Sequence, residues 1–244
     1  MIIERSMNDE WLSNTYLVAD EEGGSALVVD AGGPCAPLVR AAERLRVNVR
    51  MLLLTHHHHD HVAEAEVWED VEVLAHPIEA AELKRVDRTI EPGETLEVGG
   101  LRVETLLTPG HTAGMLNFVI NGSDVFTGDT LFKGSVGGVR APGSTSFADL
   151  EHSIMEVLMK LPPETRVQPG HTDPTTIGDE WEGNAFVRLW RGLDEEGDEP
   201  CQVWEKDATL VLWAPDYDGG HKAWVRWPDG SDDIVPGSQV VRKA

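Results

Sequence analysis

THHHHDH, residues 55–61, directly follows the apolar run MLLL of residues 51–54. Such a run is typical of a fully buried strand. In an extended chain, residues two apart point the same way. His56 and His58 can therefore reach one metal ion as neutral imidazoles. Asp60 and His61 follow where the chain must turn, and they can serve a second ion. The pattern predicts a metal site at the end of a strand.

Three further stretches end a strand pattern with a metal-binding residue type. TPGHT at residues 108–112 offers His111, QPGHT at 168–172 offers His171, and FTGDT at 126–130 offers Asp129. Each glycine permits a sharp turn that presents the next side chain. Together with His56, His58, Asp60 and His61 of the first stretch, they supply five histidines and two aspartates. Seven nitrogen and oxygen ligands are the set that a dinuclear centre with one bridging carboxylate requires.

Strand and helix patterns alternate outward from these stretches. Strands are expected at residues 15–18, 25–29, 71–74, 101–107, 115–120 and 125–126. Helices are expected at residues 37–45 and 146–161, the second beginning at Ser146 with Asp149 three positions later, as in a capping box. The alternation favours an α/β layered domain.

The residue composition changes after Leu193. Residues 193–202 contain the acidic stretch DEEGDEP and are interpreted as a linker between a domain at 1–192 and a small β domain at 203–244. Strands are expected at 209–213 and 221–227. Trp204, Trp213, Trp224 and Trp227 fall in this segment, and we expect them to form the core of a mini-barrel. A ligand groove is the alternative for these tryptophans.

Over roughly residues 14–186, the chain resembles the metallo-β-lactamase-fold hydrolases, and most of all the glyoxalase II (hydroxyacylglutathione hydrolase) branch, which GDTLF at 128–132 also matches. The resemblance implies a four-layer αββα sandwich with the site at its edge, here followed by the small C-terminal all-β appendage. It implies that His56, His58 and His111 bind one metal ion, that Asp60, His61 and His171 bind the other, and that Asp129 bridges them. Asp30 matches a supporting aspartate that orients a ligand histidine. From the residues alone, an ordinary turn aspartate is an equal interpretation of Asp30.

The resemblance also implies a reaction. Two divalent ions, with zinc favoured over iron, would generate hydroxide from a shared water. The hydroxide would attack a carbonyl carbon. The resemblance favours a small acyl thioester as the substrate. Asp60 hydrogen-bonds the nucleophile while ligating. Lys133 is a candidate for holding a substrate carboxylate, with a solvated loop lysine as the alternative. His57 and His59 are expected to face away from the metal ions.

Two other functions stay open at this point. A mononuclear iron enzyme of the persulfide dioxygenase kind resembles this ligand set, and the sequence does not fix the metal. A metallohydrolase of another small ester, lactam or lactone, with the C-terminal β domain as a partner-binding module, is the other.

Net charge limits the classes of partner, and the cysteines limit the kinds of structural site. With 43 acidic against 20 basic residues, the net charge of -23 argues against nucleic acid and against anionic membranes. The substrate is therefore expected to be a small molecule, and a homo-oligomer is compatible with the sequence. Cys35 and Cys201 are far apart, which disfavours a disulfide framework or a cysteine zinc site. The N-terminal residues do not have the pattern of a signal peptide, and a cytoplasmic location is expected.

Overall fold

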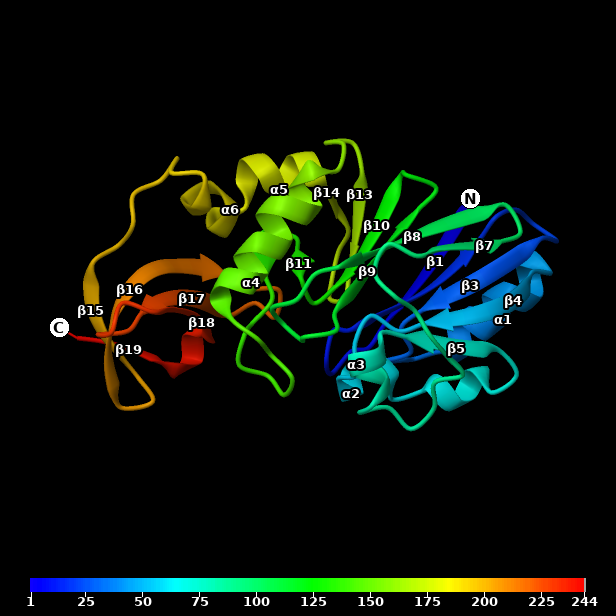
Figure 1. Cartoon of the computed structure of the whole chain (residues 1–244), viewed down its shortest axis with the longest axis horizontal. Helices are drawn as coiled ribbons and strands as arrows, with labels where there is room; N and C mark the ends of the chain where they lie inside the picture. The colour runs from blue at the N-terminus through cyan, green and yellow to red at the C-terminus, as the bar shows by residue number, and fades with distance from the viewer. Residues whose placement is uncertain (244) are drawn as a thin grey trace. The chain divides into compact units, whose positions relative to one another are not determined.

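The computed structural model describes residues 1–243, and the chain divides into two compact units. The first consists of residues 1–107, 114–128 and 167–173, and the second of 108–113, 129–166 and the chain from 174 onward. Figure 1 traces the chain by colour from its N-terminus to its C-terminus. The domain boundaries expected at residues 192 and 202 remain a prediction about how the chain folds.

The first unit contains a six-stranded sheet in the order β1-β2-β3-β4-β5-β6. Strands β1 to β3 pair antiparallel, and β3 to β6 pair parallel. Residues of β2 are buried along its whole length, as in a strand that is covered on both faces. The bounds are β1 Ile2–Met7, β2 Asn14–Ala19, β3 Ser25–Val29, β4 Asn48–Leu53, β5 Glu72–Ala75 and β6 Arg88–Thr89.

A second sheet of this unit runs in the order β13-β10-β9-β8-β7. Strand β8 alternates buried and exposed residues over its first five positions, which is the pattern of a sheet with one face on the core. The bounds are β7 Thr95–Val98, β8 Leu101–Leu107, β9 Leu116–Ile120, β10 Asp124–Gly128 and β13 Arg166–Pro169.

Two apolar clusters define the layers of the first unit. One cluster joins the facing sides of the two sheets and includes Leu27, Leu53, Phe118 and Phe126. The other joins the opposite side of the first sheet to α1 and to the 3-10 turn η1, and Figure 1 shows α1 beside β3 and β4. Helices of this unit are α1 Ala36–Leu45, α2 His59–Val62 and α3 Pro77–Ala80, with η1 at Ala65–Trp68.

The sheet register brings the ends of several strands to one edge. Val29, the last residue of β3, pairs with Leu53, the last residue of β4, in parallel. The residues that follow both strands therefore leave the sheet together. At the end of the second sheet, Gly170 donates its N–H to the carbonyl of Gly128 at 2.8 Å, which aligns the chain after β13 with the end of β10. An isolated bridge between Ser13 and His171 joins the two sheets at this edge.

Helical segments of the second unit include the stretch predicted at residues 146–161. That stretch is helical but changes its winding, from α4 Phe147–His152 through the π-helical turn η2 Ser153–Val157 to the 3-10 turn η3 Leu158–Lys160. Ser146 caps it as predicted, since its Oγ accepts the N–H of Asp149 at 3.1 Å. Two more helices are α5 Ile177–Gly183 and α6 Ala185–Trp190. Short strands are β11 Leu131–Phe132, β12 Ser135–Val136 and β14 Thr175–Thr176.

The C-terminal segment forms a five-stranded sheet in the order β18-β17-β16-β15-β19, orange to red in Figure 1. Its core is built from aliphatic side chains and Cys201 rather than from the tryptophans, so that expectation is wrong in part. Trp204 is 44% exposed, Trp213 and Trp227 are half-buried at the margin, and Trp224 packs on Phe147 of α4 instead. The bounds are β15 Glu199–Val203, β16 Lys206–Pro215, β17 His221–Arg226, β18 Asp232–Pro236 and β19 Val240–Arg242, with η4 at Gly237–Gln239.

The observed architecture confirms the predicted mixed α/β fold with an all-β sheet at the C-terminus. Cys35 and Cys201 are both buried, free thiols. Within residues 1–243, no helix combines the length and the apolar character that crossing a membrane requires.

Candidate metal centre

The loop after β4 is shaped by a close approach of two backbones. α2 begins directly after His58, whose backbone is still extended. The carbonyl of His61 accepts the N–H of Ala31 at 2.7 Å, so α2 rests on the loop that follows β3. A Cβ added to Gly32 would lie 1.6 Å from the carbonyl oxygen of Asp60. Only glycine leaves room for this contact, which sets the position of Asp60.

Three potential ligand atoms form a nearly equilateral triangle at the end of α2. Nε2 of His61 lies 3.4 Å from Nε2 of His171 and 3.6 Å from Oδ2 of Asp60. The distance from Nε2 of His171 to that Asp60 oxygen is 3.5 Å. Tetrahedral zinc with ligands at about 2.0–2.1 Å separates its ligand atoms by about 3.3–3.4 Å. The triangle is therefore of a size that holds one zinc-sized ion.

The ring orientations of these two histidines suit ligation. Nδ1 of His61 donates to Oδ2 of Asp30 at 3.0 Å, and Nδ1 of His171 donates to the carbonyl of Trp11 at 3.0 Å. Both acceptors are oxygens, which require a proton on Nδ1. In the neutral ring, Nε2 then carries the lone pair that binds a metal.

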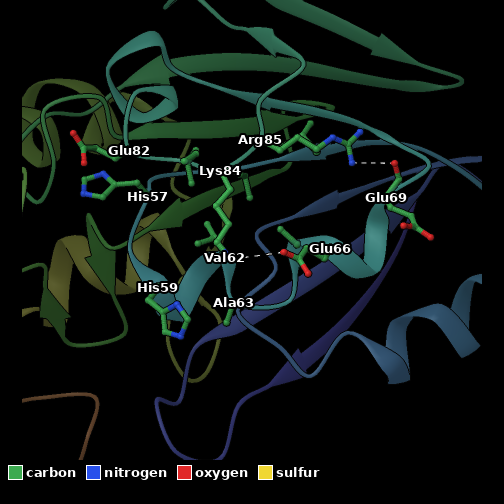
Figure 2. Close-up of a pocket in the computed structure, with 13 residues that line it drawn as sticks. His57, His59, Val62, Ala63, Glu66, Glu69, Glu82, Lys84 and Arg85 are labelled. Carbon is green, nitrogen blue, oxygen red and sulfur yellow. Dashed lines mark hydrogen bonds and ion pairs between the residues drawn. The ribbon is translucent and has the colours of Figure 1, made fainter.

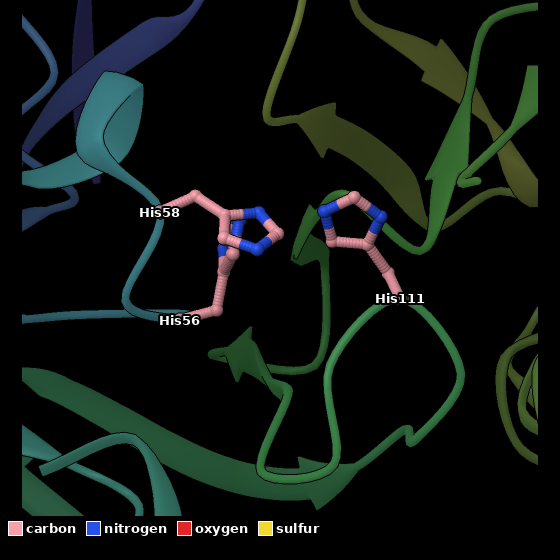
Figure 3. A group of neighbouring side chains, drawn as sticks. All are labelled: His56, His58 and His111. Carbon is pink, nitrogen blue, oxygen red and sulfur yellow. The ribbon is translucent and has the colours of Figure 1, made fainter. Parts of the chain in front are cut away.

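His56 and His58 lie together, as their spacing of two predicts. Their ring centroids are 4.5 Å apart, and Figure 3 shows the two rings side by side. Nδ1 of His56 lies 3.0 Å from Oγ1 of Thr55, and this hydroxyl donates to Oδ2 of Asp30 at 2.9 Å. The hydroxyl proton is thereby used, so Thr55 accepts from His56 and directs the Nε2 side of that ring as in His61. Potential ligand atoms of His56 and His61 lie within 4.8 Å of each other.

His111 and Asp129 belong to the second unit, where they lie next to each other. Nε2 of His111 is 3.4 Å from Oδ2 of Asp129, and both side chains are buried. Nδ1 of His111 donates to the carbonyl of Gly138 at 2.8 Å. Nδ1 of this ring therefore carries the proton and Nε2 the lone pair, as in His61 and His171. The loop is held from behind, since Ser144 Oγ donates to the carbonyl of His111 at 2.8 Å.

A buried tyrosine supports the strand that leads to His171. Tyr16 in β2 donates its hydroxyl to the carbonyl of Pro169 at 2.8 Å. Burial raises the pKa of Tyr16 far above its ordinary value, so the hydroxyl keeps its proton. Asn14 donates to the same carbonyl at 3.0 Å. Together these contacts fix the start of the turn that presents His171.

The remaining histidines of the motif point elsewhere. His57 and His59 line a cavity of about 560 Å³ that also includes Val62 and Leu83, as Figure 2 shows for the labelled residues. Lys133 lies on the exposed turn between β11 and β12. Its suggested role in substrate binding stays a prediction.

Two residues that orient these rings were not singled out from the sequence. Thr55 is the first residue of the THHHHDH stretch, and its position beside Asp30 follows from the parallel pairing of β3 with β4. Trp11 acts through its carbonyl and lies 160 positions from His171. A backbone acceptor at that separation has no local sequence signal.

Comparisons with known proteins agree on one family. A family model described as the metallo-beta-lactamase superfamily matches residues 8–84 and 68–171. The hydroxyacylglutathione hydrolase GloC of Haemophilus influenzae is 32% identical over 197 residues, covering 71% of this chain and 92% of that protein. The probable polyketide biosynthesis zinc-dependent hydrolase BaeB of Bacillus velezensis is 32% identical over 174 residues, covering 69% of this chain and 76% of that protein.

Solved structures give the same answer. TTHA1623, crystallised in a di-iron-bound form, is 32% identical with a TM-score of 0.65, and the match covers 75% of this chain and 99% of that one. ETHE1 from Myxococcus xanthus is 26% identical with a TM-score of 0.69, and the match covers 80% of this chain and 92% of that one.

Proposed function

Because the chain belongs to the metallo-beta-lactamase superfamily, we propose that it is a dinuclear metal-dependent hydrolase that cleaves a small acyl thioester. The observation that carries the proposal is the triangle of Asp60, His61 and His171. Its ligand atoms have the spacing of a tetrahedral zinc site, and the Nδ1 atoms of both rings are bound to oxygens. The spacing and ring orientation of these side chains suit a bound metal ion. Packing alone would not require either.

We assign the three side chains drawn in Figure 3, His56, His58 and His111, to one ion. Asp60, His61 and His171 would hold the second ion. Asp129 would be the ligand that both ions share. Chain connectivity supports the two residues from the second unit. His111 lies in the short segment of residues 108–113, which belongs to the second unit but connects two segments of the first. Asp129 directly follows Gly128, the last residue of a first-unit segment, and Gly128 is hydrogen-bonded to Gly170.

When bound, such ions lower the pKa of a water molecule toward neutrality and polarise a substrate carbonyl. The protein supplies orientation and proton handling. The Asp60 side chain is 29% exposed, so its other oxygen can accept a hydrogen bond from the nucleophilic water while Oδ2 faces the two histidines. Asp30 and Thr55 keep the rings of His56 and His61 in one tautomer through the reaction.

A thioester is the proposed substrate because a thiolate leaves readily and because GloC is a hydroxyacylglutathione hydrolase. Lys133 remains the candidate for holding a substrate carboxylate. Zinc is the proposed metal, since BaeB is named as zinc-dependent; iron is the alternative, since TTHA1623 was crystallised with a di-iron centre. We further propose a cytoplasmic enzyme acting on small molecules.

Metal analysis combined with a substrate panel tests the proposal. Protein reconstituted with zinc is expected to bind two ions per chain and to hydrolyse S-lactoylglutathione or another thioester. His171→Gln is expected to lose one ion and at least 100-fold in turnover, as loss of a ligand does. His152→Gln, which alters an exposed histidine of α4, is the matched control and is expected to keep both metal ions and wild-type turnover.

Two outcomes would contradict the proposal. Metal-loaded protein that is inert toward every thioester but cleaves an oxygen ester, lactam or lactone has another substrate class. One iron per chain, with oxygen uptake on a persulfide, identifies a dioxygenase instead.

A further inference from the structure

Glu79 is a fully buried carboxylate for which the sequence interpretation has no role. It lies in α3, directly after β5, and its exposed fraction is 0%. A buried carboxylate is costly unless hydrogen bonds satisfy it. The location of its donors therefore shows which parts of the chain this residue serves.

All three side-chain contacts of Glu79 go to segments that carry the proposed ligands. Oε2 accepts the backbone N–H of His57 at 3.0 Å and also binds Nδ1 of the His57 ring. Oε1 accepts the backbone N–H of Gly114 at 2.8 Å. His57 stands between His56 and His58, and Gly114 comes three residues after His111.

The fit around Gly114 is close. A Cβ added there would lie 2.7 Å from Oε1 of Glu79 and 2.7 Å from Nδ1 of His76. That His76 nitrogen also accepts the N–H of Ile78 at 3.2 Å, which caps α3 and fixes the helix that carries Glu79. The carboxylate is thus held by its own helix and reaches outward to two loops.

The cavity beside the histidine loop explains why such a contact is needed. His57 and His59 line this space of about 560 Å³, so the loop lacks close packing on that side (Figure 2). Side chains alternate along the extended part of the loop. A bond that holds the backbone and ring of His57 on one side therefore fixes the direction of His56 and His58 on the other.

We propose that Glu79 is a positioning residue of the metal centre, which holds the His56–His58 segment in ligating geometry and anchors Gly114, where the chain returns to the first unit after His111. The inference rests on the proposed function for the metal centre itself. Glu79 touches neither ion nor substrate; it acts through His57 and Gly114. Partners of ligand residues contribute about 10-fold to 100-fold to metal affinity.

Cobalt substitution tests this role without relying on turnover. Metal-free wild-type protein, Glu79→Gln and Glu79→Ala are titrated with Co²⁺, and affinity and the visible ligand-field spectrum are recorded. Glutamine can accept with one atom only, and its amide group would face a donor of His57 or Gly114. We expect Glu79→Gln to bind Co²⁺ about 10-fold to 100-fold more weakly with an altered spectrum, and Glu79→Ala to bind more weakly still.

Glu82→Gln is the matched control, because Glu82 lines the same cavity one turn further on but has an exposed side chain. It is expected to keep the wild-type affinity and spectrum. Gly114→Ala approaches the same contact from the other side and is expected to reproduce the spectral change with Glu79 intact. It serves where circular dichroism shows that the Glu79 variants do not fold.

If folded Glu79→Gln binds Co²⁺ with wild-type affinity and an unchanged spectrum, the inference is overturned and Glu79 is an ordinary buried acid. If only Gly114→Ala folds, the same result in that variant overturns the inference. Failure of the proposed function looks different. In that case wild-type protein binds cobalt and the variants bind it less well, but no thioester is hydrolysed.

Discussion

Oδ2 of Asp30 lies 3.0 Å from Nδ1 of His61, across a separation of 31 residues in the chain. The same oxygen accepts the hydroxyl of Thr55 at 2.9 Å, and Oδ1 accepts the backbone N–H of Thr55 at 2.8 Å. Through Thr55 the network continues to Nδ1 of His56. One buried carboxylate therefore orients two histidines that we assign to different ions.

Asp30→Asn is expected to weaken zinc binding by about 10-fold to 100-fold. An asparagine that keeps its oxygen on the N–H of Thr55 turns its amide group toward the hydroxyl of Thr55 and Nδ1–H of His61. Donors then face donors, and both rings lose their fixed tautomer. Calorimetric titration of metal-free protein with Zn²⁺ measures the change.

Asp70→Asn provides the control, since Asp70 is an exposed aspartate in a turn. It is expected to bind zinc as wild type does. Equal affinities for Asp30→Asn and Asp70→Asn would mean that the contact between Asp30 and His61 plays no part in metal binding.

Local patterns in the sequence explain which features could be predicted. Strand periodicity and the glycine turns located β2, β3, β8 and β10 and the stretches that present His111 and His171, because each signal lies within a few residues. The contact of Asp30 with His61 could be anticipated only from a family resemblance. The carbonyl of Trp11 that binds His171 depends on tertiary structure alone.

The misplaced tryptophan core has a physical reason. Val203 pairs with Lys206, which leaves Trp204 and Glu205 as a two-residue hairpin turn. Both have positive φ angles, 49° and 65°, as in a type I′ turn. Asparagine and glycine are the usual residues there, so composition gave no sign that this tryptophan stands in a turn. At the tip of a hairpin its side chain is exposed, and aliphatic residues of the paired strands fill the core.

Gly32→Ala is expected to destabilise the protein by about 1–3 kcal/mol and to weaken metal binding. The new Cβ would lie 1.6 Å from the carbonyl oxygen of Asp60 and 3.0 Å from Oγ of Ser13, so the backbone of Asp60 must move. Urea unfolding and zinc titration report the two effects. Gly183→Ala is the control, because a Cβ at this last residue of α5 has no atom within 4 Å apart from its chain neighbours and the backbone of its own helix. A Gly32→Ala protein as stable as that control would contradict the close approach.

Cys35 is expected to resist alkylation in the folded protein. Its side chain is buried and contacts Nε1 of Trp68 at 3.4 Å, and burial raises its pKa to about 11, against 9.0 for an ordinary thiol. The difference of 2 pH units leaves about 100-fold less thiolate at a given pH below 9, and the thiolate is the reactive form. Iodoacetamide at about pH 8 followed by peptide mass mapping measures the modification. Full labelling in urea is the control, and rapid labelling of native protein would exclude a raised pKa.

Glu180 is expected to make stability fall as the pH rises. This carboxyl is buried in the second unit, where it accepts the N–H of Gly134 and the amide of Asn184, each at 2.8 Å. Burial raises its pKa above the ordinary 4.5, although the hydrogen bonds act in the opposite direction. The folded state therefore binds this proton more tightly than the unfolded state. The stabilising contribution is complete below pH 4.5 and is lost as the pH rises through the raised pKa.

Comparison with Glu180→Gln isolates this effect, because glutamine does not titrate. The free energy of unfolding of wild type minus that of Glu180→Gln is expected to decrease from about pH 4.5 to about pH 8, as measured in urea. Glu164→Gln changes an exposed glutamate, and its difference from wild type should stay level over that range. If the difference in unfolding free energy between wild type and Glu180→Gln increased with pH, the hydrogen bonds from Gly134 and Asn184 would outweigh burial. The pKa of Glu180 would then lie below that of an ordinary glutamate, and its charged form would be the one that stabilises the fold.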